Sequence, residues 1–135
     1  MKQMILLGLF GTFLIVQSSF KPAVVAHKVD LQQSSVAWTG YKVSGKHQGS
    51  IQLKSGELKF DASKLVGGNF EIDMTSITCS DLTGEYADKL VGHLKSDDFF
   101  GSANHPTAKF VITQAIHQGK DLYKVSGDLT IKGTA

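Results

Sequence analysis

HLKSDDFFGSANHPTAKF, residues 93–110, connects the one helical pattern in this sequence to a strand. Before and at the start of it, Tyr86, Leu90 and Leu94 recur every four residues, which is typical of the apolar face of a helix. Near its end, Pro106 disfavours a helical conformation at the preceding residue and so favours the start of a strand. The paired phenylalanines between these points can pack between a helix and a sheet. We therefore interpret the stretch as a structural junction.

Around this junction, apolar residues alternate with polar residues, as in strands that bury one face of an antiparallel sheet. The alternating runs cover residues 34–43, 50–60, 67–77, 107–116 and 122–133. Ser55-Gly56 divides the second run and predicts a hairpin turn, and the change of phase at Ile77 predicts a bulge. Ser80 or Asp81 is expected to cap the helix. The pattern predicts an all-β antiparallel barrel or curved sheet of six short strands, with one short helix between the fourth and fifth strands.

The charge distribution excludes nucleic acid as the main partner. The chain has 135 residues, enough for one domain, and all 14 of its basic residues are lysines. Only two of these lysines precede residue 27, so the rest of the chain balances 12 lysines against 12 acidic residues. A protein that binds DNA or RNA needs clustered positive charge and commonly uses arginine, and this sequence has neither.

The first 26 residues have the layout of a secretory signal peptide. Lys2 precedes an uncharged, mostly apolar core from residue 4 to residue 16, which is short for a transmembrane helix. Val24-Val25-Ala26 offers a cleavage point before His27, and residues 16–18 offer a second one. We expect residues 1–26 to be removed and the protein to be periplasmic or secreted; the alternative is an uncleaved N-terminal anchor.

No catalytic or metal-binding constellation is complete in the sequence. His93 with Asp97 or Asp98 can form a general base with an orienting carboxylate, but no nucleophile or metal-ligand spacing completes the group. Cys79 is the only cysteine and has no histidine near it in sequence, so a buried thiol is the simpler interpretation. The five histidines are scattered, at positions 27, 47, 93, 105 and 117. We expect no catalytic residues, no metal and no cofactor.

Four segments in order resemble the YceI-like family of exported bacterial proteins that bind lipids or polyisoprenoids. They are VDLQQSSVAWTG, GELKFDASKLVGGNFEIDMTSI, HLKSDDFFGSANHPTAKFVIT and VSGDLTIKG, and the likeness extends from Val29 to Gly133. The resemblance implies one domain over residues 27–135, a lipocalin-like antiparallel β-barrel around an apolar channel. Family members continue beyond the last segment with further strands. The resemblance therefore also implies that C-terminal strands are missing here and that the barrel is incomplete or open.

Apolar residues on the inward faces of the strands are the candidate ligand-binding residues. They are Trp38, Ile51, Leu53, Leu58, Phe60, Phe70, Ile72, Phe110, Ile112, Tyr123, Val125 and Leu129. Residues of this kind can line a cavity or fill a solid core, and the resemblance favours a ligand channel. His93, Lys95 and His105 are candidate contacts for a ligand head group.

Together these observations predict an exported, non-catalytic protein that holds an isoprenoid or another long-chain lipid such as a fatty-acyl chain. One alternative is a packed structural or stress-response barrel without a ligand. The other is an enzyme that uses His93 and Asp98. The last strand has nothing after it to cover its edge, so a homodimer through that edge is also expected to be accessible.

Overall fold

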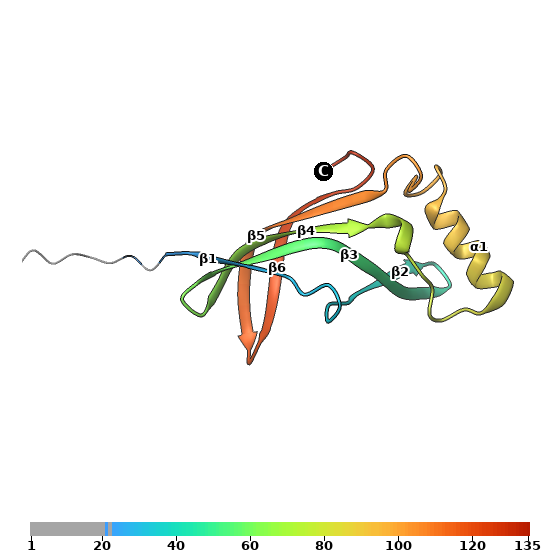
Figure 1. The fold of residues 1–135 in the computed structure, drawn as a ribbon. Helices are drawn as coiled ribbons and strands as arrows, with labels where there is room; N and C mark the ends of the chain where they lie inside the picture. The colour runs from blue at the N-terminus through green and yellow to red at the C-terminus, as the bar shows by residue number, and fades with distance from the viewer. Residues whose placement is uncertain (1–20, 22) are drawn as a thin grey trace, which may run out of the picture.

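The computed structural model of the protein describes Lys21 and residues 23–135 (Figure 1). Its elements are β1 (Val25–Lys28), β2 (Val36–Lys42), β3 (Gly45–Asp61), β4 (Lys64–Asp73), the 3-10 turn η1 (Met74–Ser76), α1 (Gly84–Lys95), β5 (Thr107–Gly119) and β6 (Leu122–Thr130). No helix in the described part of the chain is long and apolar enough to cross a membrane.

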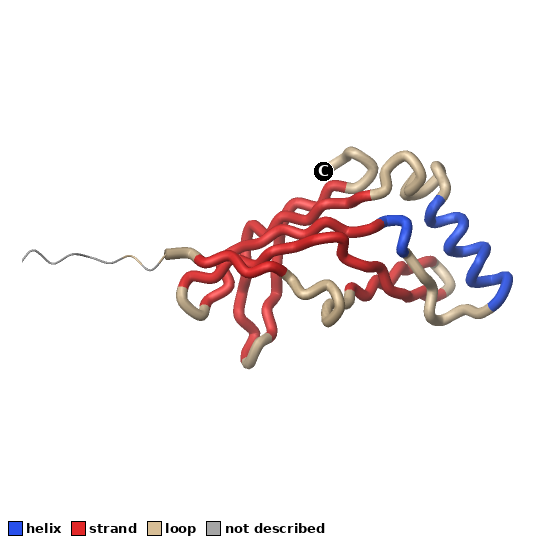
Figure 2. Tube along the Cα trace, viewed as in Figure 1, coloured by secondary structure: helices blue, strands red, loops and turns tan. Residues whose placement is uncertain are grey.

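All strand pairs are antiparallel and form one open sheet in the order β1-β3-β4-β5-β6. The second strand, β2, pairs with the first part of β3, and β1 pairs with its last part. Figure 2 shows the strands curving around one another, with the helix at one end of the sheet. The predicted all-β class is confirmed, as an open lipocalin-like sheet with one helix between the fourth and fifth strands.

The predicted signal peptide lies almost wholly outside the described residues. The structure does describe Val25 and Ala26, which the sequence analysis placed before the cleavage point. These two residues belong to β1 and pair with Phe60 and Lys59 of β3. A strand therefore begins before His27, and periodicity did not mark it because all four of its residues are exposed.

The predicted hairpin at Ser55-Gly56 is wrong. The third strand continues through both residues, with a shift in register between Leu53 and Ser55. A Cβ atom at Gly56 would lie 2.7 Å from Cδ1 of Phe70. Gly56 therefore lets the Phe70 ring approach the backbone of β3 closely. Such close approaches, like turns, are a common reason for glycine in a strand.

Two local predictions near the helix are also wrong. The change of phase before Ile77 is the 3-10 turn η1, which Asp73 caps by accepting hydrogen bonds from the Thr75 backbone N–H (2.9 Å) and hydroxyl (2.6 Å). These hydrogen bonds lower the pKa of Asp73 below its ordinary value, and the bond from the Thr75 hydroxyl has the larger effect. The helix itself begins at Gly84 after Thr83, so neither of the predicted capping residues caps it.

The buried core lies where the helix end, η1 and the sheet meet. Its buried members are Ile51, Met74, Ile77, Leu94 and Ala108, and seven partly buried apolar residues pack against them. The junction after the helix is fixed by backbone hydrogen bonds, among them Phe100 N–H to the Leu94 carbonyl (3.0 Å) and Gly101 N–H to the Ser96 carbonyl (2.8 Å). Gly101 adopts a positive φ of 55°, which glycine permits.

After η1, the chain runs beside β3 in place of a further strand. The Thr78 N–H donates to the Ser50 carbonyl and the Ser80 N–H to the Gln48 carbonyl, both at 2.9 Å. The Thr78 carbonyl in turn accepts the indole N–H of Trp38 at 3.0 Å. This segment covers the backbone of β3 on the side away from β2.

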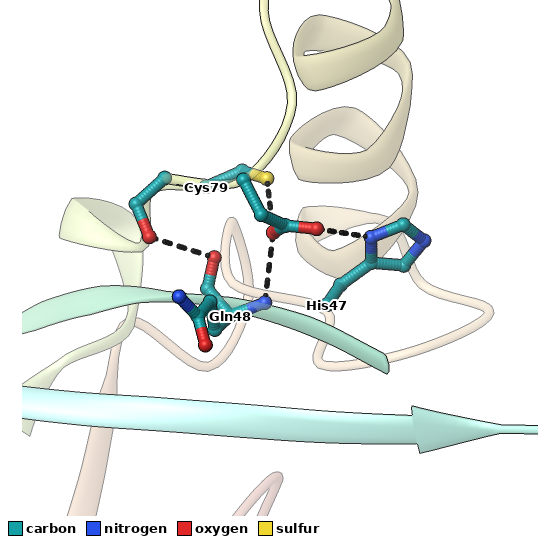
Figure 3. A network of polar contacts seen from close by, with 5 residues as sticks. His47, Gln48 and Cys79 are labelled. Carbon is teal, nitrogen blue, oxygen red and sulfur yellow. Dashed lines mark hydrogen bonds and ion pairs between the residues drawn. The ribbon is translucent and has the colours of Figure 1, made fainter. Parts of the chain in front are cut away.

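Asp81 ends this segment with a cluster of polar contacts (Figure 3). Its carboxylate accepts the Gln48 backbone N–H (2.8 Å) and the Cys79 thiol (3.3 Å), and it contacts Nδ1 of His47 at 2.8 Å. The hydrogen bond from the Gln48 N–H, and to a smaller extent the hydrogen bond with His47, holds the pKa of Asp81 well below its usual range. The residue predicted to cap the helix therefore fixes the helix-leading segment to β3.

Replacement of Asp81 by asparagine should remove part of the acid sensitivity of folding. The folded-state pKa is lower than the unfolded value of about 3.9, so the carboxylate's stabilising effect is complete above that value and is lost as the pH falls through the folded pKa. Urea unfolding of both proteins at pH 7 and below pH 4 measures this. The wild type should lose more of its free energy of unfolding than Asp81→Asn does. An equal loss in both proteins would contradict the assignment.

Candidate functional site: an apolar trough

The register of the sheet places inward-facing residues in rows across several strands. One row consists of Gly56, Phe70, Phe110 and Leu129, from β3, β4, β5 and β6. A neighbouring row consists of Leu53, Ile72 and Ala108, and a third of Leu58, Gly68, Ile112 and Gly127. Each row therefore combines large apolar residues with glycine or alanine on the inner face.

Two of the glycines make room for aromatic rings. A Cβ atom at Gly127 would lie 2.1 Å from the Val111 carbonyl oxygen and 2.9 Å from two ring atoms of Phe110. The Phe70 ring lies in the same way against Gly56. The rings pack against the backbone of a neighbouring strand, which leaves open space above them on the inner face.

Near the helix, this space is a cavity of about 320 Å³. Its lining residues are Val36, Trp38, Thr39, Gly40, Ile51, Ile72, Met74, Ile77, Leu94, Phe99, Phe100, Ala108, Leu129 and Ile131. Trp38 contributes its ring to this wall while its N–H is satisfied by the Thr78 carbonyl. Among the described residues that line it, only Thr39 carries a side-chain hydroxyl.

A second cavity of about 480 Å³ adjoins the first. It is lined by Val29, Ser34, Ser35, Val36, Leu53, Leu58, Phe70, Ile72, Phe110 and Leu129. Val36, Ile72 and Leu129 line both cavities, so the two lie side by side along the inner face, and we call them together the apolar trough. Each volume falls in the range of small-molecule sites, and a lining this apolar suits a hydrocarbon chain.

Eight of the twelve residues proposed from the sequence line the trough. They are Trp38, Ile51, Leu53, Leu58, Phe70, Ile72, Phe110 and Leu129. The other four lie elsewhere: Phe60 packs edge-on against His27, Ile112 is buried, Tyr123 lies beside His117 with ring centres 5.0 Å apart, and Val125 is exposed. Phe60, Tyr123 and Val125 lie beyond the register shifts of the β3–β4 and β5–β6 pairs, where simple alternation fails, whereas Ile112 lies in an inward-facing row but is buried.

Several lining residues were absent from the sequence-based set. Val36, Met74 and Ile131 share the alternation of residues that were chosen, so the same signal could have found them. Leu94, Phe99 and Phe100 come from the helix end and the junction, which the tertiary fold brings over the sheet. The helical period places Leu94 on an apolar face, but no period in the sequence places Phe99 and Phe100 on the wall.

The candidate head-group residues lie outside the lining of the trough. His93 packs edge-on against Phe99, a lining residue, with ring centres 5.8 Å apart. Lys95 lies near enough to Asp73 to lower the pKa of that carboxyl, although less than the Thr75 bonds do. The His105 N–H donates to the Gly101 carbonyl at 2.8 Å. His93 therefore packs against the outside of the trough wall.

His93 and Asp98 are not joined in the described part of the structure. Within the described chain, no hydrogen bond or ion pair joins the two side chains, and no group of three or more metal-ligating side chains comes together. Lys132, from the end of the chain, donates to the carbonyls of Asp97 and Phe99 and so attaches the junction to the segment after β6. No pattern in the sequence indicates this contact.

Comparisons with known proteins identify related sequences. The model of the YceI-like domain matches residues 27–135. A UPF0312 protein of Shewanella denitrificans is 30% identical over 139 residues, which cover 98% of this chain and 68% of that protein. UPF0312 proteins of Azotobacter vinelandii and Pseudomonas syringae pv. tomato are 27% and 29% identical over 115 residues, or 82% of this chain. The chain spans 58% of the length of these last two relatives.

Proposed function

Because the chain belongs to the YceI-like family, we propose that it is an exported binding protein that holds a long apolar chain, an isoprenoid or fatty-acyl lipid, without converting it chemically. The apolar trough formed by the two adjoining cavities is the observation that carries the proposal. Each methylene of a ligand moved from water into such a site contributes about 0.8 kcal/mol. A chain that runs through both cavities would therefore bind by its hydrocarbon alone, and its end group would remain at a mouth of the trough.

The only tryptophan of the chain offers a direct test. Trp38 lines the first cavity, so a ligand that enters should change the intensity and wavelength of its fluorescence. We expect a saturable change during titration with a long-chain fatty acid or isoprenoid alcohol, and a much weaker response to a short-chain homologue. Native mass spectrometry of the protein from its source should also show a co-purified lipid. A flat titration together with a clean apo mass would establish the alternative, a barrel without a ligand.

We also propose that the N-terminal segment directs export and is removed. N-terminal sequencing of the exported protein should find His27 first if cleavage follows Ala26, or a residue soon after Ser18 if the earlier site is used. Cleavage after Ala26 would remove Val25 and Ala26 from β1, together with their pairing to Phe60 and Lys59. Cleavage at the earlier site would leave β1 whole. An intact Met1 terminus in the membrane fraction would contradict the proposal.

A further inference from the structure

The turn between β2 and β3 exposes two apolar side chains at one end of the sheet. Tyr41 is 82% exposed, and Val43 is fully exposed. Both lie in residues 41–46, YKVSGK, which we call the β2–β3 tip. Isolated apolar residues are common on protein surfaces, but two neighbouring ones at the end of a hairpin are the first part of a contact surface.

The charges beside these residues all have one sign. Lys42 and Lys46 lie within the tip, and the chain has no acidic residue from residue 31 to residue 56. Tyr41 and Lys46 are direct cross-strand partners, so the ring and the ammonium group lie on the same face of the hairpin. Asp81, an acid that the structure brings to this hairpin, is engaged by His47 and Gln48.

The tip also adjoins the trough. Thr39 and Gly40, the residues directly before Tyr41, line the first cavity together with Trp38. Phe99, which is half exposed, lines the same cavity from the helix junction. A surface that contacts the tip would therefore lie close to the helix-side part of the trough.

We propose that the β2–β3 tip docks this protein onto an anionic lipid bilayer and presents the helix-side end of the trough to it. Tyrosine favours the level of the lipid head groups, valine the acyl boundary below it, and lysine the phosphates above it. This inference rests on the proposed function, because docking of this kind would let an apolar chain pass between bilayer and trough without crossing water.

The opposite hairpin provides a matched control. Leu122, at the turn between β5 and β6, is 65% exposed and is flanked by Lys120 and Lys124. It lies at the other end of the sheet from the tip, since β3 runs from the β2–β3 turn toward the β3–β4 turn and β5 ends beside the latter. It lines neither cavity of the trough. Non-specific binding to vesicles would involve both hairpins, whereas specific docking involves the tip alone.

Co-sedimentation with vesicles tests the proposal. Wild-type protein should bind vesicles of mixed phosphatidylglycerol and phosphatidylcholine, and binding should weaken with added salt and on pure phosphatidylcholine. Lys42→Gln/Lys46→Gln should weaken binding by about 30-fold, given the usual contribution of a lysine near an anionic surface. Tyr41→Ser/Val43→Ser should weaken it by at least about tenfold. Leu122→Ser should bind as the wild type does.

Other outcomes would overturn the proposal. These are no binding to either kind of vesicle, an equal loss in Leu122→Ser, or a concentration-dependent dimer that the tip variants abolish, which would identify a second copy of the chain as the partner. The Trp38 titration with dispersed ligand, run on every variant, separates the two proposals. Ligand binding without vesicle binding refutes docking alone, and absence of ligand binding in all proteins refutes the lipid-binding function.

Discussion

Leu129→Asp should raise the Kd for a long-chain fatty acid or isoprenoid alcohol by about 100-fold and leave the fold intact. Leu129 lines both cavities, so a ligand in the trough contacts it wherever the chain lies. It is also 44% exposed, and an aspartate there can stay hydrated while the trough is empty. A bound hydrocarbon would strip water from that carboxylate, at a cost of about 2.7 kcal/mol or more, which corresponds to the expected change in Kd.

Val125→Asp is the matched control for this variant. Val125 lies on the same strand, is 38% exposed and lines neither cavity. Val125→Asp introduces the same charge four residues from Leu129. The Kd from its Trp38 titration should stay within about threefold of the wild-type value. Equal losses in the two variants would indicate a general effect of charge or folding. Unchanged binding in Leu129→Asp would show that the ligand does not use the trough.

Gly49→Ala should destabilise the protein by about 3 kcal/mol, a large share of the stability of a small domain. A Cβ atom at this buried position would lie 1.8 Å from the Thr78 carbonyl oxygen and 2.8 Å from the Trp38 ring. The methyl group can fit only if the segment after η1 moves away from β3. That movement would break the bonds that Thr78 makes with Ser50 and Trp38.

A second glycine gives the opposite expectation in the same experiment. Gly92 lies within α1, and nothing lies within 4 Å of a Cβ atom placed there. Gly92→Ala should therefore stabilise the protein by up to about 1 kcal/mol, because alanine favours the helix and restricts the unfolded chain. Urea unfolding, followed by Trp38 fluorescence and by circular dichroism, measures both variants. A neutral Gly49→Ala would show that the segment after η1 does not pack against β3 as described.

The sequence by itself determined the class of the fold and most of the apolar wall. Alternation at period two reports which residues face the same side of a strand, and that information is local. It predicted inward faces for residues such as Trp38, Phe70, Phe110 and Leu129, which line the two cavities in the structure. The four-residue spacing from Tyr86 to Leu94 and the position of Pro106 likewise located the helix and the start of β5.

The sequence misplaced features whose cause lies in a distant part of the chain. Gly56 was interpreted as a turn residue, although its role is to admit the ring of Phe70 from the next strand. Asp81 has the residue type of a helix cap, but His47 and Gln48 offer it stronger partners that are more than thirty residues away in sequence. In both cases the residue type is compatible with two structural roles, and a contact with a distant part of the chain determines which role it takes.

Only the tertiary structure decided that the inner face is a trough whose helix-side part adjoins the β2–β3 tip. Whether apolar residues form a solid core or line a cavity depends on how far apart the walls stand, and no periodicity encodes that distance. Here the curvature of β3, the glycines beneath Phe70 and Phe110, and the placement of Phe99 and Phe100 over the sheet set it. Side-chain faces follow from local backbone geometry, but the space between them follows from packing across the whole sheet.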